Sequence, residues 1–145
     1  GCILINQTPM LRGINDNPDI LAELFKKLES VGVPPYYVFQ CRPTSGNRVY
    51  VVPVEEGYSI FRKAVQSCSG LAGRARYIMS HKTGKVEVVG MTDSEIVFRY
   101  HRCPDKSMIG RTMIMKRNPE ALWFDDYPIP EDLLAVVPEP KVHLA

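Results

Sequence analysis

Two amphipathic segments, each set between continuous apolar runs, constrain the fold of this chain more than any other feature. The first follows Asn17-Pro18 and repeats apolar residues at spacings of three and four up to Gly32, the pattern of a capped helix. The second runs from about Val54 to Cys68. The sequence therefore predicts two helices, each of which joins one strand to the next.

The runs around these helices are Cys2 to Ile5, Tyr36 to Cys41 and Ala75 to Ser80, and they read as strands. Such continuous apolar runs are typical of parallel strands covered on both faces. The order strand, helix, strand, helix, strand fits right-handed crossovers within one sheet. We therefore expect an α/β fold with a β-α-β-α-β unit over residues 1–90.

The pattern changes after the polar turn that holds Lys82 and Lys85. Short extended runs at Val86 to Val89, Glu95 to His101 and Thr112 to Lys116 follow one another without helices, which favours an antiparallel meander. The stretch Glu120 to Tyr127 reads either as a last short strand or as a helical turn. We expect a small antiparallel extension over 91–127 and an irregular proline-rich tail over 128–145.

Composition limits the classes of partner. A net charge of +2 in 145 residues, with scattered basic side chains, predicts neither a nucleic-acid nor a membrane partner. No apolar run approaches the roughly 20 residues of a membrane span, and no signal peptide is visible, so we expect a cytoplasmic protein. The cysteines at 2, 41, 68 and 103 form no C-x-x-C pair, which predicts free thiols and no metal site.

The stretch Ala75 to Gly90 holds the residues that most suggest chemistry. Lys82 and Lys85 lie beside His81 in a polar turn between two apolar runs. A lysine at the mouth of a strand can bring its amine to a carbonyl or a phosphate. The same residues also fit a β-hairpin with a Thr-Gly turn and solvated lysines.

Three motifs carry a resemblance to a known family. Asn6 to Asp16, Pro35 to Cys41 and Tyr77 to Lys85 resemble, in order and spacing, the C-terminal half of the lysine 2,3-aminomutase family of radical S-adenosylmethionine (SAM) enzymes. The resemblance covers roughly residues 1–90. It implies that the chain supplies the later strands of an incomplete (β/α) barrel.

The resemblance also implies cofactors. Members of the family hold a [4Fe-4S] cluster on a C-x-x-x-C-x-x-C loop, cleave SAM to a 5′-deoxyadenosyl radical, and migrate an amino group carried on pyridoxal phosphate (PLP). The C-x-x-x-C-x-x-C motif does not occur in these 145 residues. We therefore expect the cluster loop in a missing N-terminal half of the same protein, and a fragment that is inactive alone.

Several strand-end residues match the family's substrate region. Gln7 matches an amide near the SAM and the substrate, although an amide that caps a loop is the alternative. Gln40 lies at the next strand end, and Arg42 and Ser80 stand at or near positions where lysine-specific members carry aspartates. An uncompensated buried ammonium costs several kcal/mol, so these residues argue against a lysine substrate.

Arg42 suggests what an amino acid substrate would carry instead. A guanidinium suits a carboxylate or phosphate, which favours a small substrate with an acidic tail if Arg42 faces the pocket. The alternative is an Arg42 side chain turned outward next to Pro43.

The family's PLP lysine is matched best by Lys85 and second by Lys82, in a loop that is shorter and holds one glycine. Either lysine could carry PLP, because an amine desolvated at a strand end loses proton affinity and becomes a better nucleophile. His81 is then a candidate for contact with the PLP ring or phosphate, with a solvated or capping histidine as the alternative.

Two hypotheses from different classes follow. One is the C-terminal part of a radical SAM aminomutase-like enzyme, and the other is a stand-alone small α/β binding module without catalytic activity. Under the first, the strand at Cys2 to Ile5 lacks its upstream neighbour, and an exposed strand edge pairs readily with another chain. We therefore expect the fragment to self-associate.

Overall fold

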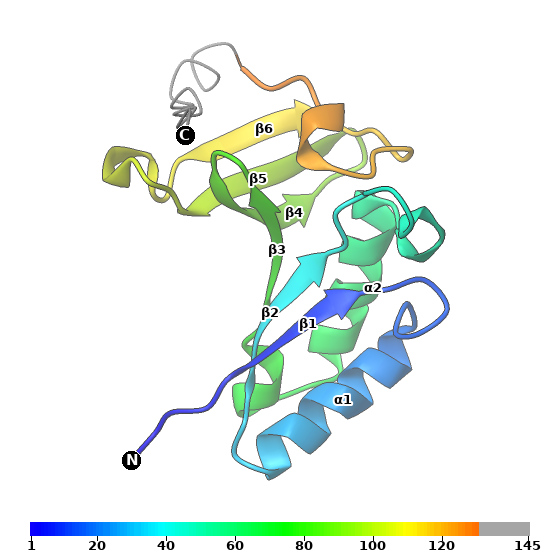
Figure 1. Ribbon diagram of the computed structural model, residues 1–145, viewed down its shortest axis with the longest axis vertical. Coiled ribbons are helices and arrows are strands. Elements are labelled where there is room, and N and C mark those ends of the chain that lie inside the picture. Colours follow the sequence, from blue (N-terminus) through cyan, green and yellow to red (C-terminus); the bar gives the residue numbers. More distant parts are fainter. Residues whose placement is uncertain (131–145) are drawn as a thin grey trace, which may run out of the picture.

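In the part of the chain that the structure describes, a six-stranded mixed sheet carries two α-helices on one of its faces (Figure 1). The computed structural model describes residues 1–130, so most of the predicted tail lies outside the described residues. The elements are β1 (Asn6–Met10), α1 (Pro18–Ser30), β2 (Pro35–Gln40), α2 (Val54–Gln66), β3 (Arg76–His81), β4 (Gly84–Met91), β5 (Glu95–Arg102) and β6 (Thr112–Lys116).

The strands lie side by side in the order of the sequence. β1, β2 and β3 are parallel and are joined by α1 and α2, whereas β3 to β6 form an antiparallel meander. This confirms the α/β class, the β-α-β-α-β order and the meander. The sheet is open, with β1 and β6 at its edges, and the incomplete barrel and the division at residue 90 stay predictions.

Both ends of α1 follow the sequence signals. The side chain of Asn17 accepts hydrogen bonds from the backbone N–H groups of Asp19 and Ile20, and Pro18 opens the first turn. Gly32 ends the helix with φ +76°, a conformation that glycine adopts without strain. The residue range of α1 is therefore fixed by its caps.

The core lies between the helices and the sheet. Apolar side chains of α1 and α2, including Phe25, Phe61 and Ala64, pack against Val38, Tyr77 and Met79 of the parallel strands. The same cluster continues along the meander and under the segment 121–127, through Val86, Phe98, Tyr100, Met113, Met115, Trp123 and Phe124. One continuous core thus holds the parallel and antiparallel parts together.

The predicted first strand is wrong in position. The first strand is Asn6–Met10, whereas the residues before it are exposed, with Ile3 at 92% and Leu4 at 60%. The apolar run has no pairing partner among the described residues, and Met10 is the side chain that enters the core. Pro9 is tolerated inside β1 because β1 is an edge strand. Self-association at this edge stays a prediction.

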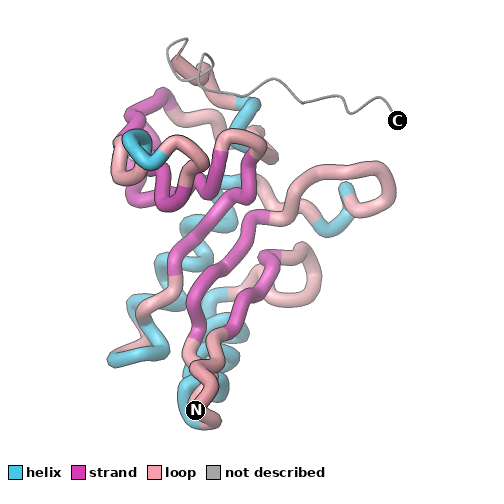
Figure 2. Tube along the Cα trace, turned by 60° about the vertical axis from the view of Figure 1, so that its left-hand side comes forward, coloured by secondary structure: helices cyan, strands magenta, loops and turns pink. Residues whose placement is uncertain are grey.

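The other sheet face is concave. Ile78 is fully buried although neither described helix covers this face, which Figure 2 shows in front of the helices. The rings of Tyr37 on β2 and His101 on β5 meet at 5.5 Å. Three strand intervals of a flat sheet would separate them by about 14 Å. The sheet therefore curls around Ile78, and we call this surface the helix-free face.

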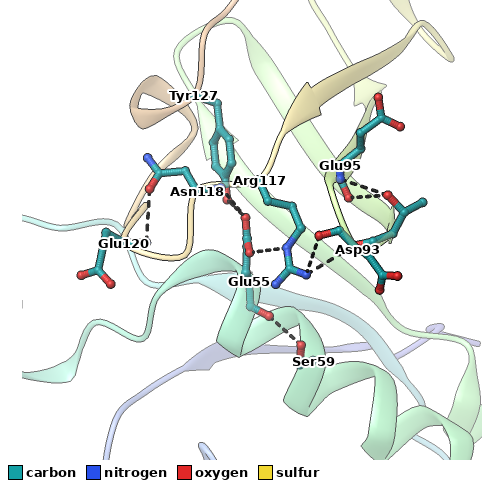
Figure 3. A network of polar contacts seen from close by, with 9 residues as sticks. Glu55, Ser59, Asp93, Glu95, Arg117, Asn118, Glu120 and Tyr127 are labelled. Carbon is teal, nitrogen blue, oxygen red and sulfur yellow. Dashed lines mark hydrogen bonds and ion pairs between the residues drawn. The ribbon is translucent and has the colours of Figure 1, made fainter.

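A buried carboxylate ties the C-terminal segment to α2 (Figure 3). Glu55 accepts hydrogen bonds from Nε of Arg117 (2.9 Å), the backbone N–H of Asn118 (2.7 Å) and the hydroxyl of Tyr127 (3.5 Å). Burial is the main cause that raises the pKa of Tyr127, and the adjacent carboxylate adds to it. This network fixes the segment that carries Trp123 and the 3₁₀ turn Phe124–Asp126, which settles the alternative for residues 120–127 as a helical turn.

Gly84, which closes the hairpin between β3 and β4, allows a stability test. It has φ +146°, and an added Cβ would overlap the carbonyl oxygen of Arg102. We expect Gly84→Ala to lower the free energy of unfolding by about 2 kcal/mol or more. Gly90→Ala is the matched control, because its Cβ would enter open space in the same strand, and it should stay within about 1 kcal/mol. Urea unfolding of both variants measures the difference, and equal losses would contradict the steric account.

Candidate functional site

Lys85 lies on the helix-free face, near the carboxyl end of β3. It pairs with Ser80 across the hairpin, and its Nζ donates a hydrogen bond to Ser80 Oγ at 3.1 Å. The same ammonium lies 4.7 Å from the ring centroid of Phe39 and 5.6 Å from that of Tyr37. Aromatic faces attract a cation at these distances, so the amine is held in one place by two strands.

A cavity of about 340 Å³ opens beside this amine. Its lining comes from the turn and from the end of β5, and consists of Ser80, His81, Lys82, Gly84, Lys85, Arg102, Cys103 and Pro104. The carboxyl ends of parallel strands are where α/β proteins place their ligands, and this cavity lies at the carboxyl end of β3. It is therefore the candidate functional site.

His81 points to the opposite face of the sheet from Lys85. Its side chain is 1% exposed and lies in a hydrogen-bonded chain that joins three elements. The hydroxyl of Tyr100 donates to Thr83 Oγ1 (2.8 Å), which lies 2.8 Å from Nδ1 of His81. The backbone N–H of Thr83 also donates to Nδ1, so Nε2 carries the ring proton and donates to Asp125 at 3.1 Å.

This arrangement favours the neutral form of the His81 imidazole. Burial is the main cause that lowers the pKa of His81, and the neighbouring Asp125 opposes it only in part. The ring also contacts Phe124 edge to face at 5.2 Å. His81 thus docks the turn Phe124–Asp126 against the lysine hairpin, and its predicted contact with PLP stays a prediction.

The side chains of Lys82 and Arg42 also lie on the side of the sheet towards which His81 points. Lys82 is 58% exposed, with Nζ 3.6 Å from Asp125, and the guanidinium of Arg42 lies 5.9 Å from the ring centroid of Trp123. Gln40 is buried, and its amide donates to the carbonyl oxygens of Val52 and Leu122. Of the predicted site residues, the structure therefore brings Ser80 and Lys85 into direct contact and separates them from the side chain of His81.

Gln7 lies on the helix-free face as well. It is exposed and stands in register with Tyr37 of β2. The structure thus places an amide on the same face as Lys85, but on the edge strand. Its predicted role near SAM stays a prediction.

The most buried charge on this face, Glu87, is not among the predicted site residues. Glu87 is 7% exposed and accepts hydrogen bonds from Arg76 (3.0 Å) and Arg99 (2.8 Å). It occupies the same alternate positions of β4 as Lys85, and Arg99 is its partner across the ladder to β5. An acidic residue within the apolar run Val86 to Val89 was the signal for such a buried ion pair.

The described residues do not fit an iron–sulfur cluster. Within residues 1–130, no group of three or more His, Cys, Asp or Glu side chains is placed to hold a metal, and the four cysteines are free thiols. In the same range, neither helix has the length and apolar character needed to cross a membrane.

The amine of Lys85 and the cationic side chain in its cavity are suited to bind PLP. This cofactor combines an aldehyde, which reacts with a primary amine, with an anionic phosphate. The cavity offers one amine held by Ser80 and the additional cation Arg102. The residues present therefore fit PLP better than they fit a cluster.

Fold and site together define an α/β protein with a strand-borne lysine beside a cavity at the carboxyl edge of a parallel sheet. Comparison with known proteins makes the assignment specific. A putative L-lysine 2,3-aminomutase of Aquifex aeolicus (strain VF5) is 55% identical over 127 residues, which is 88% of this chain and 34% of that protein. No protein-family model matches.

Two further relatives carry the same enzyme name. The L-lysine 2,3-aminomutase of Clostridium subterminale is 40% identical over 60 residues, 41% of this chain and 14% of that protein. The enzyme of the same name from Escherichia coli (strain K12) is 36% identical over 70 residues, 48% of this chain and 20% of that protein. The chain belongs to the lysine 2,3-aminomutase family, and it spans 14 to 34% of the length of these three relatives.

Proposed function

We propose that this chain is the C-terminal part of an aminomutase that moves an amino group within an amino acid, and that it contributes Lys85 to the active site. The observation that carries the proposal is the placement of the Lys85 amine, 3.1 Å from Ser80 Oγ and over the ring of Phe39, beside a cavity at the carboxyl edge of the sheet. Family membership supports the reaction class.

Under this proposal, Lys85 holds PLP and Ser80 fixes the amine by accepting its hydrogen bond. The rings of Phe39 and Tyr37 shield one side of the amine from water. PLP, when bound, supplies an aldehyde carbon that carries the migrating amino group. The [4Fe-4S] cluster and the SAM site are proposed to lie in the part of the relatives' length that this chain does not span, since the described residues offer no ligand set for a cluster.

The substrate we propose is an amino acid other than lysine. Ser80 and Arg42 stand where aspartates would receive a side-chain ammonium. The buried carboxylate on the helix-free face, Glu87, is already neutralised by Arg76 and Arg99. A lysine side chain would thus find no uncommitted carboxylate among these positions, and a buried unpaired ammonium is costly.

The full-length protein, supplied with SAM, PLP and a reductant, tests the proposal. We expect 5′-deoxyadenosine and a β-amino acid, both quantified by mass spectrometry, from at least one α-amino acid and little product from lysine. The chain of 145 residues alone is the control and should form neither product. Full-length protein that forms no 5′-deoxyadenosine with any amino acid would overturn the proposed reaction class.

A further inference from the structure

A second cluster of functional groups lies on the helix-free face next to the lysine site. We name it the arginine–tyrosine cluster, and it consists of Tyr36, Tyr37, Arg76, Arg99 and Arg102. Tyr37 links it to the lysine site, because its ring lies 5.6 Å from Lys85 Nζ and its hydroxyl donates to that of Tyr36 at 3.0 Å. So far Arg102 has been considered only as a cation that lines the lysine cavity, and Arg76 and Arg99 only as the partners of Glu87.

The cluster carries an excess of positive charge. Arg76 and Arg99 line one cavity with His101, and Arg102 follows His101 in β5. Within the described residues, Glu87 is the one carboxylate paired with these guanidinium groups. Three positive charges against one negative charge leave a net charge of +2. Burial is the main cause that lowers the pKa of His101, which disfavours a further positive charge on its imidazole.

The guanidinium groups keep donors for a ligand. Glu87 is contacted by one nitrogen of Arg76 and by one nitrogen of Arg99. Each guanidinium has five N–H donors, so most remain available, and the two side chains are 40% and 36% exposed. A cavity of about 230 Å³ opens beside them, lined by Arg76, Arg99, Tyr100, His101, Ile109 and Gly110.

The pair Tyr36 and Tyr37 provides a hydroxyl that can donate a hydrogen bond to a ligand. Because Tyr37 donates to the oxygen of Tyr36, the O–H of Tyr36 is left to donate elsewhere. The hydrogen bond from Tyr37, followed by Arg102 and Arg76, lowers the pKa of Tyr36, while burial raises the pKa of Tyr37 to about 12. These shifts agree with a local positive field at Tyr36.

We propose that the arginine–tyrosine cluster binds an oxyanion, either a carboxylate or a phosphate group of a ligand. Planar guanidinium forks match both groups, and an oxyanion would relieve the repulsion among three cations that one carboxylate leaves in place. The inference does not require aminomutase activity. If the proposed function holds, a ligand could reach Lys85 and the cluster together, since Tyr37 contacts both.

Calorimetric titration of the 145-residue chain with inorganic phosphate and with glutarate, at constant ionic strength in chloride, tests the site. We expect saturable binding of at least one anion. Arg102→Gln and Tyr36→Phe should each weaken it, the arginine change by about tenfold or more. Arg62→Gln removes the same charge from an exposed position of α2, on the other face, and should change the affinity by less than about twofold.

The two anions distinguish the source of the oxyanion. Tighter binding of phosphate assigns a phosphorylated ligand, and tighter binding of glutarate assigns a carboxylate ligand, and both results support the site. No saturable binding of either anion, or an equal loss in Arg102→Gln and Arg62→Gln, would overturn the proposal. Activity of the full-length protein plays no part in this readout, so failure here is distinguishable from failure of the proposed function.

Discussion

Replacing Lys85 by alanine in the full-length protein is expected to lower the rate of amino-group migration by on the order of a thousandfold or more. The amine of Lys85 is the one that two strands hold, through Ser80 at 3.1 Å and the ring of Phe39 at 4.7 Å. Loss of the amine removes the proposed attachment point of PLP. Rates of β-amino acid formation, with product identified by mass spectrometry, measure the effect.

Lys82→Ala is the matched control for that change. Lys82 belongs to the same hairpin and carries the same charge, but its side chain is 58% exposed and faces Asp125. We expect its loss to change the rate by less than about tenfold, as for an exposed ion pair. A thousandfold loss in Lys82→Ala together with an active Lys85→Ala protein would assign the cofactor to the other lysine.

The largest stability effect is expected from Glu55→Ala. The carboxylate is 4% exposed and receives donors from Arg117 and Asn118, so its removal leaves a partly buried guanidinium and a backbone N–H without their acceptor. We expect the free energy of unfolding to fall by about 3 kcal/mol, at the lower end for a broken buried pair because Arg117 retains some contact with water. Urea denaturation gives the value.

The neighbouring Glu56→Ala is the control. Glu56 makes a bidentate ion pair with Arg12 at 2.6 and 2.7 Å, yet both side chains are about 40% exposed. Exposed pairs contribute little, so we expect a loss below about 1 kcal/mol. If both variants lost the same free energy, burial would not explain the role of Glu55.

The sequence predicted the elements whose signals are local. Asn17, Pro18 and Gly32 marked the ends of the first helix, and the meander followed from short extended runs without helices. The first strand was misplaced because an apolar run alone does not reveal its pairing partner. Residues 2–5 are apolar and exposed, whereas Asn6–Met10, polar in part, pairs with β2.

Of the groups in direct contact at the candidate site, Lys85 and Ser80 could be predicted from the sequence. Their pairing follows once the hairpin register is known. Alternation along the strands then sends His81 to the other face, which a list of neighbouring residues in one turn does not show. Asp125 and Arg99 meet their partners 44 and 12 residues away in the sequence, so their roles depend on the tertiary fold.

Lys85 is the amine proposed to carry PLP, and a trapping experiment tests this assignment by locating the attached cofactor. The full-length protein is incubated with PLP, reduced with borohydride and digested, and the modified lysine is located by mass spectrometry. We expect a pyridoxyl group on Lys85 and little on Lys82, independent of any turnover. A protein modified mainly at Lys82, or unmodified at both positions, would contradict it.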